Sequence, residues 1–271
     1  VYIVKKEEDI MKKFNKFLSV AVASAMVMSM AGCGNTDNGS AATGTNAATE
    51  SAASGSVFKI GGIGPTTGDA AIYGTAVQNG AQIAVDEINE AGGINGHQIE
   101  YNFQDDQGDP EKAANAYNTL KDWGMQVLMG TVTTGPCVSV ADLTAADNMF
   151  QITPSASSTD VIKNDNVFQV CFTDPAQGTK SAQYIGENNL AKKVAIIYNS
   201  SDIYSSGIEA KFVEEAANQN FEVVAEEAFT ADSKTDFSTQ LQKAKDAEAD
   251  LVFLPIYYTA VSYTHLRPHE T

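Results

Sequence analysis

From Val57 onward, short apolar segments alternate with amphipathic helical segments, and this alternation constrains the fold more than any other feature of the sequence. Such a pattern is typical of parallel sheets, because consecutive parallel strands need a crossover between them that is usually a helix. We expect strands at 57–63, 97–103, 127–129, 150–153, 168–172, 193–198, 221–228 and 251–256. The sequence therefore predicts an α/β fold with parallel sheets.

Turn and capping residues indicate where the intervening helices begin and end. Gly92-Gly93 should end a helix that runs from about residue 76 to 91. Asp109-Pro110-Glu111 should begin the next helix with a capping carboxylate, a proline at the first helical position and an acid in the first turn. Thr173-Asp174-Pro175 marks a crossing point, after which a second series of alternating segments begins. We expect a first lobe at 57–174 and a second at 175–259.

The segment before the first lobe has the pattern of a lipoprotein signal peptide at residues 11–32. Three lysines, Lys12, Lys13 and Lys16, precede an apolar run that ends at Met30-Ala31-Gly32-Cys33. This run is too short for a good membrane span and matches a secretory signal. A lipid on Cys33 would anchor the mature protein to the cell membrane without spanning it. The alternative is an ordinary cleaved signal followed by a chance cysteine.

Residues 33–56 form the expected lipidated cysteine and a flexible linker. Residues 34–56 contain no large apolar side chain and cannot bury enough surface to fold, so we interpret them as a tether. Residues 1–10 precede the first methionine, Met11. We interpret them as upstream read-through and leave them out of the fold.

The charge balance excludes nucleic acid as a partner. The chain has 17 Lys and Arg against 34 Asp and Glu, and residues 1–32 hold five of the lysines and three of the acids, which leaves 12 against 31 and a net charge of −19. Such a surface should repel nucleic acid and anionic headgroups. Beyond Cys33 there are two cysteines, Cys137 and Cys171, which we expect to be free thiols, although one bridge between them remains an alternative.

An ordered series of motifs resembles the leucine/isoleucine/valine-binding protein family. These motifs are Gly64-Pro65-Thr66-Thr67-Gly68, Tyr73-Gly74, Gly80-Ala81, residues 89–96 (NEAGGING), Asp105-Asp106 with Asp109-Pro110, residues 130–134 (GTVTT), residues 152–158 (ITPSASS), residues 194–198 (VAIIY), Tyr204, Gly207 and Asp236-Phe237-Ser238. Each motif alone is weak, but their order and spacing over residues 57–258 are specific.

The resemblance implies the type I periplasmic-binding-protein fold, in which two Rossmann-like lobes with parallel sheets are joined by a hinge. It implies an extracytoplasmic, lipid-anchored substrate-binding protein of an ABC importer, which is monomeric, binds a branched-chain-like amino acid between its lobes and delivers it to an ABC permease. No enzymatic activity, cofactor or metal is expected. The alternatives are a receptor for another small solute, such as an amide or a carboxylate, and an enzyme on an α/β scaffold.

The resemblance also places eight ligand-binding residues in a cleft between the lobes: Tyr73, Thr133, Thr134, Ser155, Ala156, Ser157, Tyr204 and Tyr257. Thr133-Thr134-Gly135 should lie at a helix start, where free backbone NH groups and the helix dipole favour a carboxylate. The loop at residues 155–157 offers oxygen acceptors for an ammonium group. The three tyrosines should cover the apolar part of the ligand. The competing interpretation is that these residues only cap helices or pack.

Other motifs favour rival functions only weakly. Gly61-Gly62-Ile63-Gly64 suggests a phosphate-binding turn, but Pro65 withholds an NH group and no helix follows directly. Residues 177–181 only approximate a P-loop, and residues 105–109 lack the full set of calcium ligands. His97 is the only histidine between the signal and the C-terminal residues, which disfavours a catalytic triad or a histidine metal site.

The end of the sequence departs from the family pattern. Residues 260–271, which include SYTHLRPHET, show neither a helical nor a strand period, and we interpret them as a non-native tail. Both lobes are then expected to be incomplete at the C-terminus. The resemblance places the family's acidic partner for the ligand ammonium in the part that is missing here.

Overall fold

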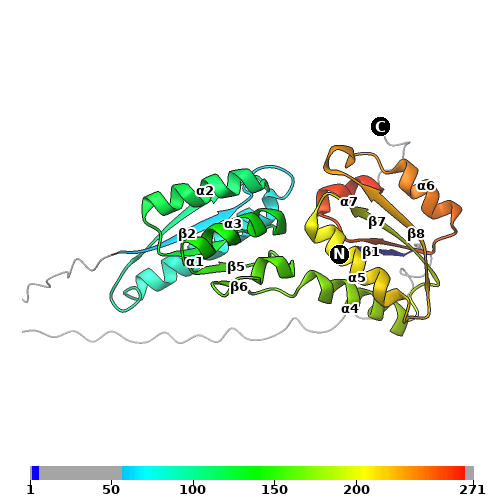
Figure 1. Ribbon diagram of the computed structural model, residues 1–271, viewed down its shortest axis with the longest axis horizontal. Coiled ribbons are helices and arrows are strands. Elements are labelled where there is room, and N and C mark those ends of the chain that lie inside the picture. Colours follow the sequence, from blue (N-terminus) through cyan, green and yellow to red (C-terminus); the bar gives the residue numbers. More distant parts are fainter. Residues whose placement is uncertain (1, 6–56, 266–271) are drawn as a thin grey trace, which may run out of the picture. The chain divides into compact units, whose positions relative to one another are not determined.

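The structure, a computed structural model, describes residues 2–5 and 57–265 and holds two sheets with helices packed on them (Figure 1). The strands are β1 (Tyr2–Lys5), β2 (Phe58–Gly64), β3 (Ile99–Asp105), β4 (Val127–Gly130), β5 (Gln151–Thr153), β6 (Val167–Gln169), β7 (Lys193–Asn199), β8 (Glu222–Phe229) and β9 (Leu251–Leu254). The helices are α1 (Ala71–Glu90), α2 (Pro110–Trp123), α3 (Thr134–Ala146), α4 (Asp174–Glu187), α5 (Ile203–Ala216), α6 (Ser238–Asp246) and α7 (Tyr258–His265), with short 3-10 helices at Thr159–Ile162 and Ala231–Ser233.

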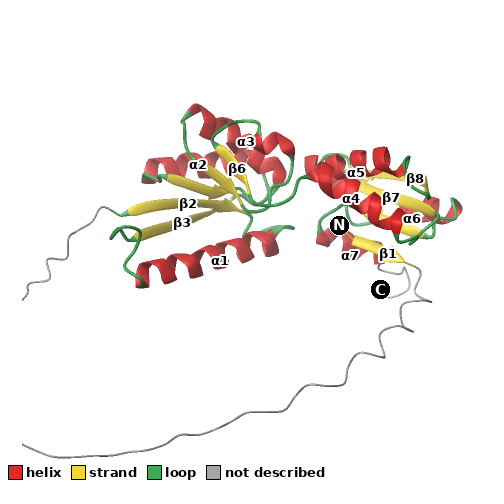
Figure 2. Cartoon of the chain, turned by 90° about the horizontal axis from the view of Figure 1, so that it is seen from below, coloured by secondary structure: helices red, strands yellow, loops and turns green. Residues whose placement is uncertain are grey.

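The first sheet has the strand order β3-β2-β4-β5-β6, and every neighbouring pair is parallel. Figure 2 shows α1 on one face of this sheet and α2 and α3 on the other. Ile63 and Leu128 from the sheet pack against Tyr117 and Leu120 from α2 and Val140 from α3, and all five side chains are buried. The predicted parallel α/β architecture is confirmed in this sheet.

The second sheet has the strand order β1-β9-β7-β8, in which β7 pairs in parallel with both β8 and β9. Successive side chains of β7 point to opposite faces of the sheet, because side chains alternate along a strand. Ile196 packs with Ile208 and Phe212 of α5, whereas Ile197 packs with Phe237 and with residues of α7. Helices therefore cover both faces of this sheet too.

Strand β1 was not expected, because the interpretation of residues 1–10 as upstream read-through left them out of the fold. Tyr2–Lys5 pairs antiparallel with β9, with Tyr2 opposite Leu254 and Lys5 opposite Leu251. The physical reason is that β9 would otherwise be an edge strand with a free row of NH and C=O groups, which is a template for any β-prone segment. The sequence YIVK, in which the first three residues are aromatic or β-branched, is suited to pair with this edge.

Helix α7 was not expected, because residues 260–271 show neither a helical nor a strand period. Residues 260–265 continue the helix that begins at Tyr258, and Ala260 and Val261 are buried in a cluster with Ile256 and Phe237. This short apolar stretch lacks a helical period over its full length, and contact with the sheet orders it instead. Helix α1 also begins earlier than expected, at Ala71.

The glycines of β2 are required by packing, which disfavours the phosphate-binding alternative. A Cβ atom at Gly61 would lie 2.6 Å from Met125 Sδ, and one at Gly62 would lie 2.4 Å from a ring carbon of Phe103. In the loop after β2, the NH groups of Thr66 and Thr67 both donate to Asp105 Oδ1, at 2.8 and 3.3 Å. The amides that a phosphate would need are therefore already bound to a carboxylate.

The expected start of α2 is confirmed. Asp109 is its N-cap residue, and Asp109 Oδ1 accepts hydrogen bonds from the NH groups of Glu111 and Lys112, both at 2.9 Å. At the other end, Gly124 adopts the left-handed conformation with φ of 89°, which is typical of a residue that terminates a helix.

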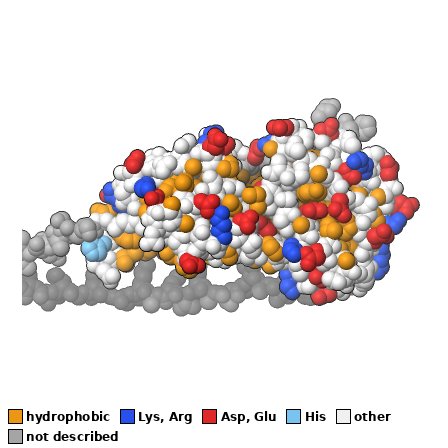
Figure 3. Space-filling view, in the orientation of Figure 1, with side chains coloured by type: hydrophobic (Ala, Val, Ile, Leu, Met, Phe, Trp, Pro, Cys, Tyr) orange, Lys and Arg blue, Asp and Glu red, His pale blue; other side chains and the backbone are white. Residues whose placement is uncertain are grey.

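Several predictions made from the N-terminal sequence lie outside the described residues. The signal peptide at 11–32, the lipidation site at Cys33 and the linker are among them. Within the described ranges, every helix is too short or too polar to cross a membrane. On the face shown in Figure 3, basic side chains form no continuous patch and are interspersed with acidic ones.

Candidate functional site

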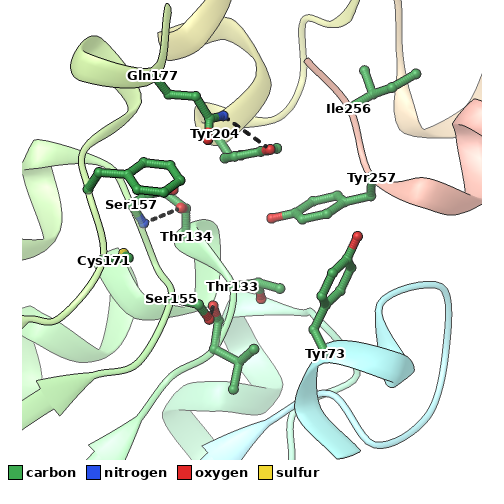
Figure 4. A pocket seen from close by; sticks show the side chains of 12 residues that line it. Tyr73, Thr133, Thr134, Ser155, Ser157, Cys171, Gln177, Tyr204, Ile256 and Tyr257 are labelled. Carbon is green, nitrogen blue, oxygen red and sulfur yellow. Dashed lines mark hydrogen bonds between the residues drawn. The ribbon is translucent and has the colours of Figure 1, made fainter. Parts of the chain in front are cut away.

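A cavity of about 490 Å³ lies beyond the carboxyl ends of β4, β5 and β9, which is where α/β proteins usually place a ligand. We call Tyr73, Val132, Thr133, Thr134, Ser155 and Ser157 the first-lobe wall, and Gln177, Tyr204, Ile256 and Tyr257 the second-lobe wall. Cys171 and Phe172, in the connection between β6 and α4, complete the lining (Figure 4).

The first-lobe wall is built around the N-terminus of α3. Thr133 is the N-cap residue, with φ of −101° and ψ of 152°, and Thr134 is the first residue of the helix. Thr134 Oγ1 accepts a hydrogen bond of 3.1 Å from the NH group of Ser157, which ties the helix start to the loop after β5. The first turn of a helix has NH groups without intrahelical acceptors, so this end favours an anion.

Two further hydroxyl groups of this wall differ in their hydrogen bonding. Ser155 Oγ donates a hydrogen bond of 2.6 Å to the carbonyl oxygen of Val132, so it fixes the loop. Thr133 Oγ1 is buried and has no hydrogen-bond partner among the described residues. A buried hydroxyl without a partner costs stability.

The second-lobe wall is aromatic. The rings of Tyr204 and Tyr257 are stacked with their centroids 5.0 Å apart and their planes at 20°. Tyr73, from α1, lies 5.9 Å from Tyr257 between centroids, and Figure 4 shows the Tyr257 hydroxyl directed into the cavity. Gln177 Nε2 donates to the Tyr204 hydroxyl at 3.4 Å. These rings present apolar faces to the cavity with polar groups at their edges.

The ionisable groups near this wall are neutral phenols and buried acids. Burial raises the pKa of Tyr204 to about 12 and the pKa of Tyr257 well above its ordinary value, so both remain hydrogen-bond donors at neutral pH. Burial also raises the pKa values of Asp174 and Asp202 to about 6. The lining residues include no Lys or Arg, so the side chains around the cavity offer an anion no cationic partner.

Seven of the eight predicted ligand-binding residues line this one cavity, although they come from segments far apart in the sequence. Ala156 is the exception. It is fully buried, and its carbonyl oxygen accepts hydrogen bonds from Gln169 Nε2 at 2.6 Å and from Cys171 Sγ at 3.5 Å. The structure therefore places Ala156 behind the wall, where it supports Cys171.

Five lining residues were not anticipated from the sequence: Val132, Cys171, Phe172, Gln177 and Ile256. The sequence contained a signal for Gln177. Thr173 caps α4 by accepting a hydrogen bond from the NH group of Ala176, which places Gln177 in the first turn of a helix that begins at the crossing point. For Val132, Phe172 and Ile256, the sequence gives no indication of a place in the cavity lining beyond their position next to the motifs.

Both described cysteines are free thiols, as expected. Cys137 is buried in α3, and burial raises the pKa of its thiol to about 11. Burial also raises the pKa of Cys171, which lines the cavity. Neither thiol is an activated nucleophile, because each is held in its protonated form at neutral pH.

Comparisons with known proteins identify the family of the chain. The profile of the periplasmic binding protein family matches residues 57–261. The chain belongs to this family. This periplasmic binding protein is similar to the Leu/Ile/Val-binding protein BraC3 of Rhizobium johnstonii, with 35% identity over 201 residues. That match covers 73% of this chain and 54% of the relative, so the chain spans about half the length of the curated relatives that it matches.

Solved structures show the same fold. The branched-chain amino acid transporter substrate-binding protein LivJ of Streptococcus pneumoniae, in complex with isoleucine, has 34% identity and a TM-score of 0.72, with coverage of 77% of this periplasmic binding protein and 59% of LivJ. A solute-binding protein of an ABC transporter from Rhodopseudomonas palustris, in complex with 3,4-dihydroxybenzoic acid, has 23% identity and a TM-score of 0.66, with coverage of 73% and 54%. The second likeness shows the fold alone.

Proposed function

We propose that this protein is the solute-binding component of an ABC importer and that it binds a free amino acid of branched-chain type. The observation that carries the proposal is the pairing of chemistries in one cavity. A helix start with Thr133 and Thr134 suits the carboxylate of such a ligand, and Tyr204 and Tyr257 suit an aliphatic side chain. The relatives that bind leucine, isoleucine and valine support this choice.

The proposed mechanism is closure of two lobes on the solute. The residues of both walls contact the same cavity, so a ligand that touches both stabilises the closed arrangement over an open one. The protein then presents the solute to an ABC permease. We assign the lobes to residues 57–174 and 175–259 and the ligand contacts to the predicted residues that line the cavity, and we expect the protein to act as a monomer.

The proposed location is extracytoplasmic, with a lipid on Cys33 that anchors the protein to the cell membrane. This part of the proposal depends on the lipoprotein signal in residues 11–33. Incorporation of labelled palmitate into the wild-type protein but not into Cys33→Ser would support it, and equal labelling of the two would contradict it.

The test of the binding proposal is a thermal-shift panel on the full gene product. The panel contains the common amino acids, their amides, and aliphatic and aromatic carboxylates, because several structural neighbours are in complex with aromatic acids. We expect leucine, isoleucine or valine to raise the Tm, by an amount set by the ratio of ligand concentration to Kd. A shift with carboxylates or amides alone would contradict the amino-acid proposal, and turnover of a bound compound would contradict a pure binding role.

A further inference from the structure

A second, smaller cavity lies at the rim where the two lobes meet, and we call it the rim cavity. It has a volume of about 100 Å³ and shares Ile256 and Tyr257 with the larger cavity. Its lining includes three charged side chains, which belong to Asp69, Asp202 and Lys234. One lysine therefore borders the same small space as two carboxylates.

Only one of these two carboxylates is paired with the lysine. Lys234 forms an ion pair with Asp69. Asp202 Oδ1 caps α5 by accepting a hydrogen bond of 3.3 Å from the NH group of Tyr204, whereas Asp202 Oδ2 is buried and has no hydrogen-bond partner among the described residues. A buried carboxylate oxygen without a partner costs stability. This arrangement of the lobes therefore satisfies Asp69 and leaves Asp202 unsatisfied.

The two carboxylates belong to different lobes. Asp69 lies in the loop between β2 and α1, in the first lobe. Lys234 follows the 3-10 helix at Ala231–Ser233, and Asp202 is the N-cap residue of α5, so both belong to the second lobe. Separation of the lobes must break the Lys234–Asp69 pair, but it leaves Lys234 and Asp202 in the same lobe.

Hydrogen bonds hold the chain before Lys234 against the chain before Asp202. The NH group of Ala231 donates to Ser201 Oγ at 3.0 Å, and the NH group of Ser200 donates to the carbonyl oxygen of Phe229 at 2.9 Å. The two segments therefore move together when the lobes separate. A lysine has a flexible four-carbon stem, so its ammonium group can turn from Asp69 to Asp202 without a change in the backbone.

We propose that Lys234 exchanges partners as the lobes move, pairing with Asp69 when they are closed and with Asp202 when they are open. Because one ion pair replaces another, opening does not lose the stabilisation of the rim contact, and closure depends on the ligand. This inference rests on the proposed function, in which two lobes close on a solute. Lys234 and Asp202 are positioning residues, because they act on the lobes and lie outside the lining of the larger cavity.

The size of the effect follows from the exposure of the pair. The side chains of Lys234 and Asp69 are about half-exposed, so loss of one pairing should change the ratio of closed to open protein by no more than about fivefold. When most of the ligand-free protein is open, the apparent affinity for the ligand changes by the same factor. The order of the variants, rather than the size of any one effect, therefore tests the exchange.

The experiment is titration calorimetry with leucine on the full gene product at pH 8. Asp69→Asn should weaken leucine binding about threefold to fivefold, because only the closed arrangement loses its ion pair. This variant keeps the Asp69 carbonyl oxygen, which accepts a hydrogen bond of 3.0 Å from Thr259 Oγ1. Lys234→Met removes the lysine from both arrangements, so it should bind leucine within about twofold of the wild type.

Asp202→Asn should have the opposite effect to Asp69→Asn. Asparagine is also a good N-cap residue, so the start of α5 is kept while the ion pair of the open arrangement is lost. Leucine binding should become about threefold to fivefold stronger. This gain should be smaller when Lys234→Met is also present, because the lysine is then absent from the open arrangement.

The difference between Asp69→Asn and Lys234→Met should depend on pH. Burial raises the pKa of Asp202 to about 6, and a paired lysine lowers this pKa in the open arrangement only. Protonation of Asp202 below pH 6 therefore disfavours the open pair, and at pH 5 the two variants should lose similar amounts of leucine affinity. The titratable side chains around Asp202 belong to Asp174, Tyr204, Tyr257, Lys234 and Asp69. Asp174 is present in both variants, so their comparison isolates Asp202.

Lys193→Met is the matched control. Lys193 is 40% exposed, close to the 41% of Lys234, and its ion pair with Glu248 lies within the second lobe. This variant should bind leucine within about twofold of the wild type at both pH values. In 1 M NaCl the differences in leucine affinity between the rim variants should disappear, because salt screens exposed charges.

Two results in protein that binds leucine would overturn the inference and leave the proposed function intact. Equal losses of affinity in Asp69→Asn and Lys234→Met at pH 8 would show that Lys234 is a simple latch with one partner. An equal gain from Asp202→Asn with and without Lys234 would show that Asp202 acts independently of the lysine. If Asp202→Asn does not fold, the comparison of Asp69→Asn with Lys234→Met decides.

A ligand-free measurement separates the inference from the proposed function. Dyes attached to keto amino acids at the exposed positions Lys112 and Lys245, one on each lobe, report the separation of the lobes by energy transfer. Asp69→Asn and Asp202→Asn should shift the transfer efficiency in opposite directions, and shifts in one direction or no shift would overturn the inference. If the wild-type protein binds no amino acid, the proposed function fails, and this measurement still decides the partner exchange.

Discussion

The two walls of the cavity differ in the chemistry of their side chains. On the first-lobe wall, Thr134 and Ser155 are hydrogen-bonded to backbone groups of neighbouring loops, at 3.1 and 2.6 Å. On the second-lobe wall, Tyr204 and Tyr257 are held by ring stacking, and buried acids without full hydrogen bonding lie behind them. The first wall presents polar groups held by backbone hydrogen bonds, whereas the second presents mainly apolar ring surface with phenol hydroxyl groups at its edges.

The difference suggests a division of labour in binding. Short hydroxyl groups fixed by backbone hydrogen bonds define the position of the polar end of a ligand at little entropic cost. Aromatic side chains of the second-lobe wall present large apolar faces against which an aliphatic ligand side chain can pack. Substitutions on the two walls should therefore differ in how much they change the ligand affinity.

The largest effect is expected on the second-lobe wall. Tyr204→Ala should weaken leucine binding by about 100-fold, which corresponds to about 2.7 kcal/mol, because it removes a buried ring that stacks on Tyr257. The matched control is Tyr184→Ala, because Tyr184 belongs to the same lobe and is 56% exposed. Calorimetry should show a change below about threefold for the control. Equal losses of leucine affinity in Tyr204→Ala and Tyr184→Ala would contradict the claim that the second-lobe wall supplies apolar contact with the ligand.

A smaller effect is expected on the first-lobe wall. Thr134→Val keeps the shape of the side chain but removes the acceptor for the Ser157 NH group, and it should weaken leucine binding by about tenfold. Thr134→Ser keeps the hydroxyl and should bind within about threefold of the wild type. If Thr134→Ser loses as much affinity as Thr134→Val, the methyl group rather than the hydrogen bond is what the wall requires.

The smallest effect is expected at the rim where the two lobes meet. Lys234 forms an ion pair with Asp69, and Thr259 Oγ1 donates a hydrogen bond of 3.0 Å to the Asp69 carbonyl oxygen. The Lys234 and Asp69 side chains are 41% and 51% exposed, so the pair should contribute at most about 1 kcal/mol to closure. Lys234→Met should weaken leucine binding less than about fivefold, and the difference from wild type should vanish in 1 M NaCl. A larger loss that persists in salt would show that the rim, rather than the walls, controls closure.

Much of the fold was predictable because it depends on local physical chemistry. Asp109 and Pro110 define the start of α2, and Gly92-Gly93 the end of α1, through backbone requirements that act within a few residues. The parallel arrangement follows from strands separated by helices. Most of the candidate site was predictable for another reason, which is that the motifs that carry Thr134, Ser155 and Tyr204 resemble those of a known family.

The features that the sequence did not predict concern segments whose structure depends on distant partners. Strand β1 pairs with the edge of β9, and the first turn of α7 is held by burial of Ala260 and Val261. Gln177 and Cys171 reach the cavity because α4 and its preceding connection lie beside the loop at 155–157. Apart from the Thr173 cap, which places Gln177 in the first turn of α4, no local pattern in the sequence describes these contacts.

The sequence by itself determined the alternation of strands and helices, the helix boundaries set by caps and glycines, the negative charge and the family. The tertiary structure alone decided that Ala156 lies behind the cavity wall and that Asp174 is buried beside Ser157, with carboxylate oxygens that have no hydrogen-bond partner among the described residues. The physical reason is that periodicity and capping depend on neighbours in the chain. The burial and pairing of a charge depend on every segment packed around it.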